Sequence, residues 1–332
     1  MSAPAIGSVS GPTRGPASGT VSGTASGTAS GTVSGAAQGN PWRPVGPCTP
    51  AACVEGPATA TGLPRTAARL TAALLVILAG IPLSLAACRI PAGLRSAITR
   101  AWARLLLRAL GIRVEAAPAA PGAAGLVVAN HISWLDPLVF AATVPSRPLA
   151  KQEIAGWPVV GRLAAGSGAL FIDRERLYAL PATVAAVAGA LRAGDTVVAF
   201  PEGTTWCGRE MGRFRPAVFQ AAIDAGAAVV PATLRYREGA VTSTRACFVG
   251  DDSLLASMLR VAATRGLAVE VTLLDPVRPA PAGRAALAAL AEARIRAHML
   301  GDVHAGRAPR ASFMTVIPAA GGGDMARSSS VA

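Results

Sequence analysis

Short apolar runs typical of buried strands alternate with longer helical stretches from residue 125 to residue 299. The expected strands cover residues 125–129, 148–151, 169–172, 196–200, 228–234, 245–249 and 267–274. The expected helices cover residues 136–143, 175–193, 214–225, 252–264 and 283–299. Because such alternation places crossover helices between parallel strands, it predicts an α/β fold with a mixed, largely parallel sheet flanked by helices.

The residues outside this alternation divide into two tails and one apolar segment. Residues 1–58 repeat Ser, Gly and Thr, and residues 301–332 are rich in Ala, Gly, Ser and Arg, so neither stretch can bury a core. We predict disordered tails over 1–58 and 301–332, a membrane-associated helical segment over 59–113, and a folded α/β domain over 114–300, which holds the candidate site residues described below.

Residues 70–88 form an uncharged stretch whose nineteen residues approach the length of one bilayer span. Three interpretations stay open: a single span, a re-entrant hairpin kinked at Pro82, and a buried helix of the domain. Arg65 and Arg69 precede the stretch and Arg89 follows it, which favours membrane insertion. The next stretch, residues 94–110, has Arg100, Arg104 and Arg108 along one side and Trp102 at its middle, a pattern typical of a helix at the lipid interface.

The formal net charge of +13 comes almost wholly from arginine. Aromatic residues make up only 4% of the chain and do not interleave with basic runs, which argues against nucleic acid as a partner. Since basic residues flank the apolar stretch, we predict an anionic membrane surface as a partner. The five cysteines show no paired metal-ligand spacing, so the sequence predicts no metal site and fits a reducing compartment.

His131 follows the expected strand at 125–129, and Asp136 lies five residues further along the chain. A carboxylate in this position can hold one imidazole nitrogen and stabilise the imidazolium, which leaves the other nitrogen to take a proton from a hydroxyl. A second interpretation is structural: Asp136 caps a helix that starts at Pro137, and His131 is a plain loop residue.

Polar residues also follow other expected strands. Glu202 and Gly203 come after the strand at 196–200, where α/β sheets bind ligands, although a plain turn with a solvated Glu is the alternative. Arg174 ends a further strand and can bind a phosphate or carboxylate, or simply pair with Asp173. Pro231 indicates a sheet edge or a bulge in the strand at 228–234.

Four segments in fixed order give the chain a clear family resemblance. They are Asn130-His131-Ile132-Ser133-Trp134-Leu135-Asp136, Gly168 to Arg174, Phe200-Pro201-Glu202-Gly203-Thr204, and Val229-Val230-Pro231-Ala232. With these segments the chain resembles the glycerolipid acyltransferase family, in particular its bacterial 1-acylglycerol-3-phosphate acyltransferases. The resemblance covers about residues 65–300.

The resemblance implies a role for each matched residue. His131 would be the general base and Asp136 its partner, and Arg174 would contact the acceptor head group. Glu202, Gly203 and Thr204 would shape the acceptor pocket, and Pro231 would lie on the acyl-donor side. One departure is that the family often has Arg directly after the Gly-Thr pair, where this chain has Thr205. Nearby guanidinium groups can replace it, and the candidates are Arg209, Arg213 and Arg215.

We therefore expect a membrane acyltransferase that uses no cofactor. The expected acyl donor is acyl-CoA or acyl carrier protein, and the expected acceptor is the hydroxyl of a lyso-lipid, most simply 1-acylglycerol-3-phosphate. Lyso-ornithine lipid is the alternative acceptor, and a non-enzymatic membrane adaptor is the alternative of another class. A serine hydrolase would need a Gly-x-Ser-x-Gly elbow, which the sequence lacks. The expected location is the cell membrane, with the catalytic domain on its cytoplasmic face.

Overall fold

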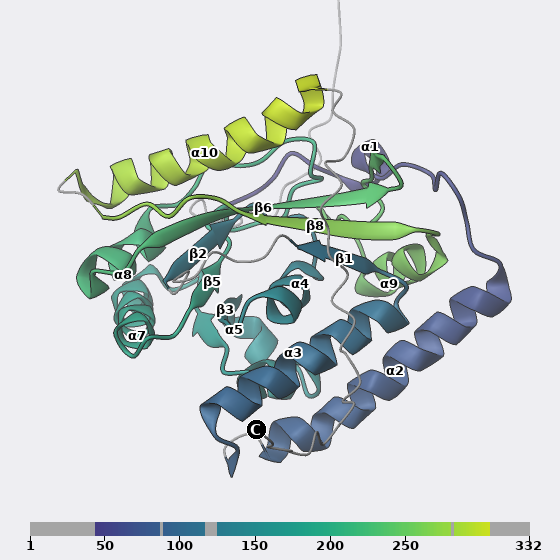
Figure 1. Cartoon of the computed structure of the whole chain (residues 1–332), viewed down its shortest axis with the longest axis horizontal. Helices are drawn as coiled ribbons and strands as arrows, with labels where there is room; N and C mark the ends of the chain where they lie inside the picture. The colour runs from purple at the N-terminus through teal and green to yellow at the C-terminus, as the bar shows by residue number, and fades with distance from the viewer. Residues whose placement is uncertain (1–43, 87–88, 117–124, 280–281, 306–332) are drawn as a thin grey trace, which may run out of the picture. The chain divides into compact units, whose positions relative to one another are not determined.

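The computed structural model describes residues 44–86, 89–116, 125–279 and 282–305 (Figure 1). The strands of its sheet are β1 (Arg113–Ala116), β2 (Leu126–Ala129), β3 (Arg147–Lys151), β4 (Leu170–Ile172), β5 (Val197–Ala199), β6 (Val229–Glu238), β7 (Val241–Thr242) and β8 (Leu267–Leu273). The strand order is β1-β8-β6-β2-β5-β3-β4, and β7 pairs with β6. Only the pairs that β6 makes with β7 and β8 are antiparallel, so the predicted mixed, largely parallel sheet is confirmed.

Helices pack on both sides of this sheet. They are α1 (Pro50–Cys53), α2 (Leu63–Ala86), α3 (Ala92–Ala109), α4 (Asp136–Thr143), α5 (Gln152–Ala155), α6 (Val160–Gly166), α7 (Leu180–Arg192), α8 (Ala217–Ala225), α9 (Leu254–Ala263) and α10 (Gly283–Ala305). A 3₁₀ turn, Leu177–Ala179, precedes α7. Figure 1 shows α10 (yellow) lying across the sheet beside β6, on the side away from α2 and α3.

The central strand β2 shows how the sequence builds two cores. Its side chains alternate, so Val127 and Ala129 pack in one core with residues of α3, α4 and α9. Leu126 and Val128 point the other way and pack with residues of α7, α8 and α10. All four side chains are fully buried, which explains why the strand is a continuous apolar run rather than an alternating one.

The strands of the structure differ from the sequence predictions in three respects. Residues 245–249 form a loop, because their backbone bonds to other loops and to the side chain of Arg260. β1 and the two-residue β7 were not expected, since β1 has only four residues, two of them charged, and β7 is shorter still. Pro231 lies inside the central strand β6, opposite Val128 of β2, and not at an edge. The sheet tolerates it there because the antiparallel pairing of β6 with β8 begins only at Ala232.

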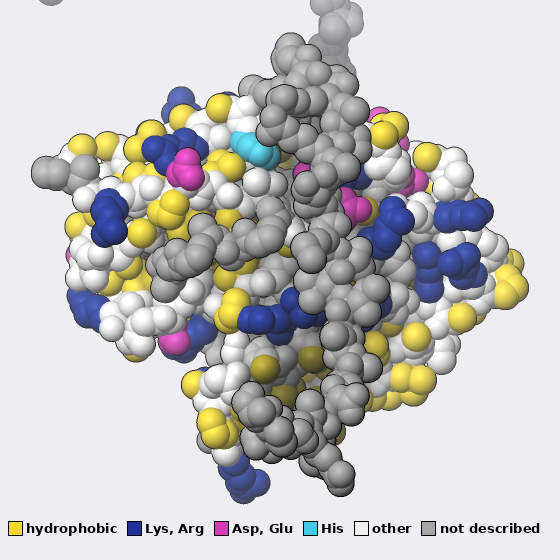
Figure 2. All heavy atoms as spheres, in the orientation of Figure 1, with side chains coloured by type: hydrophobic (Ala, Val, Ile, Leu, Met, Phe, Trp, Pro, Cys, Tyr) yellow, Lys and Arg dark blue, Asp and Glu magenta, His cyan; other side chains and the backbone are white. Residues whose placement is uncertain are grey.

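The apolar stretch forms one continuous helix, α2, which contains Pro82. By length and composition α2 could cross a membrane, and only 11% of its most apolar window is buried. Six of its leucines are exposed, namely Leu63, Leu74, Leu75, Leu78, Leu83 and Leu85. The interpretation of α2 as a buried core helix is therefore wrong. In Figure 2, hydrophobic side chains gather along the line that α2 follows in Figure 1.

One side of α2 packs against α3 and the domain. Near its start, the Arg69 guanidinium donates to the carbonyls of Ala262 and Thr264, each at 2.8 Å. Further along, Trp102 of α3 donates its indole N–H to the Val76 carbonyl at 2.8 Å, and its ring fills the space left by Gly80. These contacts fix α2 lengthwise against the domain and leave its leucine face uncovered by described residues.

Residues 44–58, the end of the predicted disordered tail, are folded in the structure. Thr49 caps the short helix α1, Pro50 occupies its first turn, and Cys48 is only 7% exposed. The Glu55 backbone N–H donates to Thr244 Oγ1 at 3.0 Å, which joins this segment to the domain. The rest of that predicted tail, 1–43, and residues 306–332 of the C-terminal one lie outside the described residues.

Candidate active site

His131 and Asp136 face each other at the carboxyl end of β2. The distance between His131 Nδ1 and Asp136 Oδ2 is 2.8 Å. Because an ionised carboxylate only accepts hydrogen bonds, Nδ1 carries the proton and Nε2 is the nitrogen available for proton exchange. The His131 side chain is 17% exposed, whereas that of Asp136 is fully buried. The imidazole thus combines a buried partner with access to solvent.

The Asp136 carboxylate accepts four hydrogen bonds, which hold it in one orientation. Oδ2 accepts from His131 and from the backbone N–H groups of Ile132 and Ser133, at 2.6 and 2.9 Å for the latter two. Oδ1 accepts from the Tyr236 hydroxyl at 2.7 Å. The side chain of Asp136 does not cap α4, whose N-cap residue is Leu135, so the helix-capping interpretation of Asp136 is wrong.

Phe200 and Glu202 fix the other sides of His131. The Phe200 ring stacks on the imidazole with centroids 4.2 Å apart and planes at 15°. The His131 backbone N–H donates to Glu202 Oε1 at 2.7 Å, and the Gly212 N–H donates to Glu202 Oε2 at 2.7 Å. β2 and β5 are parallel neighbours, so the residues that follow them meet at one edge of the sheet. Glu202 therefore joins the loop that follows β2 to the Gly212 end of its own loop, beside the imidazole.

Burial shifts the pKa of two of these groups. Glu202 is 3% exposed, and its desolvation raises its pKa from 4.5 to about 8, although the N–H groups of Gly212 and His131 act in the opposite direction. Burial also raises the pKa of Tyr236 well above its usual value, and the charge of Asp136 adds to this effect. Tyr236 is thus a neutral hydrogen-bond donor at neutral pH.

Arg174 and Gly203 meet at the next turn. The Arg174 guanidinium, which follows β4, donates to the backbone carbonyl of Gly203. Gly203 has a φ of +76°, and a Cβ at this position would lie 2.5 Å from Pro44 Cγ. Thr204 lies against the same segment, where its Cγ2 would be 3.6 Å from a Cβ on Gly46. Residues 44–46 therefore cover the turn next to Arg174.

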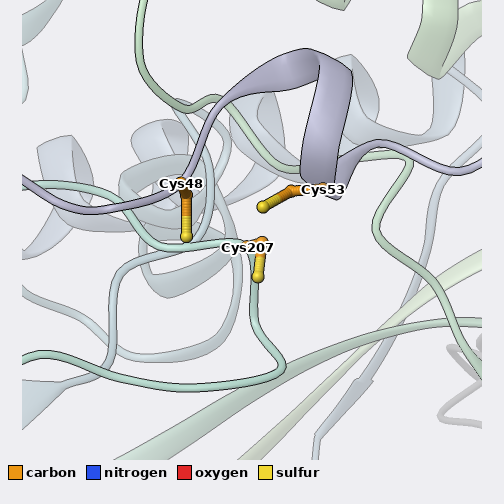
Figure 3. A group of neighbouring side chains, drawn as sticks. All are labelled: Cys48, Cys53 and Cys207. Atoms are coloured by element: carbon orange, nitrogen blue, oxygen red, sulfur yellow. The ribbon is translucent and has the colours of Figure 1, made fainter. Parts of the chain in front are cut away.

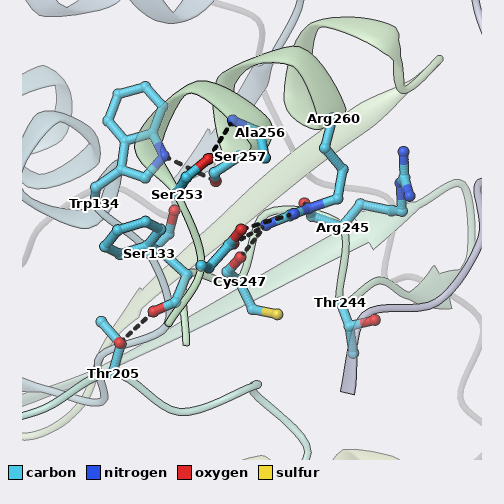
Figure 4. A network of polar contacts seen from close by, with 12 residues as sticks. Ser133, Trp134, Thr205, Thr244, Arg245, Cys247, Ser253, Ala256, Ser257 and Arg260 are labelled. Carbon is cyan, nitrogen blue, oxygen red and sulfur yellow. Dashed lines mark hydrogen bonds and ion pairs between the residues drawn. The ribbon is translucent and has the colours of Figure 1, made fainter. Parts of the chain in front are cut away.

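A second loop is anchored beside the site by Arg260 (Figure 4). Its guanidinium donates to the Cys247 carbonyl at 2.6 Å and pairs with Asp252 at 2.5 Å. The neighbouring Phe248 N–H donates to the Ile132 carbonyl at 3.0 Å, and the Thr205 hydroxyl donates to the Phe248 carbonyl. Thr205, which stands where the family often has Arg, thus ties two loops together.

The remaining residues that the sequence analysis named are Pro231, Arg209, Arg213 and Arg215. Pro231 lies in the strand next to β2, buried within the sheet. Arg209 forms an ion pair with Glu55, and Arg213 and Arg215 are exposed in the same loop. The structure thus brings His131, Asp136, Glu202, Gly203 and Arg174 into one connected set.

The sequence analysis missed three residues that support this set. They are Tyr236, Phe200 and Asn130. The Asn130 side-chain amide donates to the Leu234 carbonyl at 3.0 Å and accepts from the Leu234 backbone N–H at 2.8 Å. Phe200 lay inside a matched segment, so its position beside the imidazole could have been expected. Tyr236 carried no signal, because it lies 100 residues from Asp136 and only strand pairing brings it there.

Comparison with known proteins identifies the family. A family model described as Acyltransferase matches residues 111–235. The chain is 35% identical over 212 residues to a lyso-ornithine lipid O-acyltransferase of Pseudomonas aeruginosa, covering 63% of this chain and 80% of the relative. It is 37% identical over 170 residues to a 1-acyl-sn-glycerol-3-phosphate acyltransferase of Neisseria meningitidis, covering 51% of this chain and 67% of the relative.

A solved structure has the same fold. The crystal structure of the 1-acyl-sn-glycerophosphate acyltransferase PlsC from Thermotoga maritima aligns with a TM-score of 0.56 at 17% identity, over 75% of this chain and 98% of that one. The resemblance drawn from the four sequence segments is confirmed. The chain belongs to the acyltransferase family that includes the lyso-ornithine lipid and 1-acyl-sn-glycerol-3-phosphate O-acyltransferases.

Proposed function

We propose that this protein transfers a fatty acyl group from a thioester to the free hydroxyl of a lyso-lipid, with His131 as general base and Asp136 as its partner. The supporting observation is the 2.8 Å contact between His131 Nδ1 and the buried Asp136 carboxylate, which leaves Nε2 for proton exchange. General-base help of this kind is worth roughly 10²–10⁴-fold in rate.

The proposed reaction needs no covalent enzyme intermediate. The acceptor oxygen forms a bond to the thioester carbonyl carbon while Nε2 of His131 takes its proton. The carbon–sulfur bond then breaks, and the imidazolium returns the proton to the leaving thiolate. Asp136 stabilises the imidazolium between these steps, and the Phe200 ring, 4.2 Å away, holds the imidazole plane. The proposed donors are acyl-CoA and acyl carrier protein, as co-substrates.

Arg174 and the Glu202-Gly203-Thr204 turn form the proposed acceptor side. A guanidinium fork beside the Gly203 carbonyl suits an anionic head group. Glu202 acts as a positioning residue in this proposal, because both of its oxygens accept backbone N–H groups. Pro231 is proposed to lie on the acyl-donor side.

The first acceptor proposed is 1-acyl-sn-glycerol-3-phosphate, since two relatives with this acceptor in their names are 37% identical to the chain. Lyso-ornithine lipid is a second candidate. It is favoured by Thr205, which replaces a phosphate-binding Arg, and by the Pseudomonas aeruginosa relative, of which the chain covers 80%. Arg209 is paired with Glu55, which leaves Arg213 and Arg215 as the exposed replacements.

We propose that α2 and α3 attach the enzyme to the cell membrane through the exposed leucines of α2 and through Leu94 and Leu105, which are exposed on the neighbouring helix α3. Because α2 packs lengthwise on the domain, partial immersion in one leaflet fits its contacts better than an isolated span. Anionic lipid is the proposed partner of the basic residues, and the cytoplasmic face is the proposed side, where acyl-CoA and acyl carrier protein are available.

The test is a transfer assay on the purified full chain with a panel of lyso-lipids and both donors. We expect His131→Ala to lose at least about 10²-fold in rate with unchanged membrane recovery. His298→Ala is the matched control and should retain activity, since His298 lies on α10 and its Nδ1 bonds with the Thr233 hydroxyl. Activity of His131→Ala within tenfold of the unsubstituted chain refutes the proposed mechanism. Vesicle binding without transfer to any lyso-lipid would favour the adaptor.

A further inference from the structure

Three cysteines that are distant in the sequence gather beside the active-site loop (Figure 3). Cys48 precedes α1, Cys53 is the last residue of α1, and Cys207 lies in the loop that follows Glu202. Their sulfur atoms all lie within 4.8 Å of one another. Cys48 and Cys207 are 7% and 6% exposed, and Cys53 is half-buried, so the group is largely shielded from water.

This geometry suits three thiolates around one metal ion. Two sulfurs on a tetrahedral zinc lie about 3.8 Å apart, at a Zn–S distance of about 2.3 Å. Because the three sulfur atoms lie within 4.8 Å of one another, metal binding requires each pair to approach by about 1 Å or less. A disulfide would bring only two of the sulfurs to about 2.05 Å and would leave the third thiol unused. All three are free thiols in the structure.

The ligand chemistry selects the ion. Thiolates are soft donors that favour Zn²⁺ and Cu⁺ over Mg²⁺ and Ca²⁺, which take oxygen ligands. We propose that Cys48, Cys53 and Cys207 together bind one Zn²⁺ ion, with the fourth coordination position open to a further ligand. This site does not depend on the acyl-transfer proposal.

The zinc would fasten residues 44–58 to the loop that follows Glu202. Three further contacts join the same two segments. Pro44 packs on Gly203, a Cβ on Gly46 would lie 3.3 Å from the Thr205 carbonyl, and Glu55 forms an ion pair with Arg209. The loop in turn reaches the catalytic pair, because the Trp206 N–H donates to the His131 carbonyl at 2.8 Å. The metal would therefore stabilise the loop that positions the imidazole.

Cobalt titration of the full chain tests this site. The protein is purified in detergent, reduced with a phosphine, freed of metal and titrated with Co²⁺, which gives sulfur-to-cobalt charge-transfer absorption in thiolate sites. We expect one Co²⁺ per chain and its displacement by Zn²⁺. Cys48→Ser, Cys53→Ser and Cys207→Ser should each weaken Co²⁺ binding on the order of 10–100-fold or more. Cys247→Ser is the matched control, since this buried thiol lies outside the group and should leave binding unchanged.

Two further measurements keep the test decisive. Circular dichroism of each metal-free variant identifies any variant that fails to fold. The test then relies on Cys53→Ser, because Cys53 is the most exposed of the three cysteines. Cleavage after Glu55 by a glutamate-specific protease should slow about tenfold with Zn²⁺, and Cys53→Ser should abolish this protection. The proposal is overturned by the absence of charge-transfer absorption, by an equal loss in Cys247→Ser, or by a disulfide in the purified protein that binds no metal after reduction.

Discussion

Tyr236→Phe removes one oxygen from the buried network that supports the catalytic pair. Tyr236 is 1% exposed, and its hydroxyl donates to Asp136 Oδ1 at 2.7 Å. The phenyl ring retains the packing of the tyrosine ring, so the loss is confined to a hydrogen bond to a charged group. Such a bond contributes about 1.5–3 kcal/mol, and Asp136 cannot replace it with water because its side chain is fully buried.

We therefore expect Tyr236→Phe to lower the free energy of unfolding by about 1.5–3 kcal/mol. At roughly 2–4 °C per kcal/mol for a domain of 150–250 residues, the thermal midpoint should fall by about 3–12 °C. The assay is unfolding of the full chain in detergent, followed by tryptophan fluorescence or calorimetry. Transfer activity measured below the transition should persist, since three donors still hold Asp136 in place.

Tyr178→Phe is the matched control, because the chain has only two tyrosines and Tyr178 is 80% exposed. Its unfolding free energy should stay within about 0.5 kcal/mol of that of the unsubstituted chain. If Tyr236→Phe is as stable as Tyr178→Phe, the hydroxyl does not stabilise the Asp136 carboxylate, and the network described for the site is refuted.

Three other substitutions test the site. Asp136→Asn preserves the shape of the side chain but removes its charge, so the transfer rate should fall by about 10²–10⁴-fold while the chain still folds, as rate and circular dichroism together will show. Because the pKa of Glu202 is raised from 4.5 to about 8, its stabilising contribution is complete below about 4.5 and is lost as the pH rises through about 8. The difference in thermal midpoint between the unsubstituted chain and Glu202→Gln should therefore decrease as the pH rises from about 4.5 to about 8. A difference that stays constant over this range contradicts the raised pKa of Glu202. Gly203→Ala should cost at least about 1–2 kcal/mol, since it combines a φ of +76° with a clash against Pro44, whereas Gly189→Ala in α7, where a Cβ meets nothing within 4 Å, should be neutral or stabilising in the same unfolding assay.

The sequence by itself determined the class of fold and the centre of the proposed site. The short length and continuous apolar character of their residues identified the central strands β2 and β5. A strand that is buried on both faces has apolar residues at successive positions. His131 and Asp136 are five residues apart, so a local turn suffices to bring them together, and their contact was predictable. The contact between His131 and Glu202 was not predicted, because only the sheet order shows that β2 and β5 are parallel neighbours.

Only the tertiary structure decided the contacts between distant segments. Tyr236 reaches Asp136 across 100 residues through the pairing of β2 with β6, which no local pattern encodes. The loop at residues 245–249 has strand-like composition, yet its backbone bonds to loops and to Arg260 instead of a neighbouring strand. Cys48, Cys53 and Cys207 lack metal-ligand spacing along the chain and become neighbours only when residues 44–58 pack on the loop after Glu202. Local periodicity reports which face of an element is buried, whereas long-range packing selects which buried faces meet.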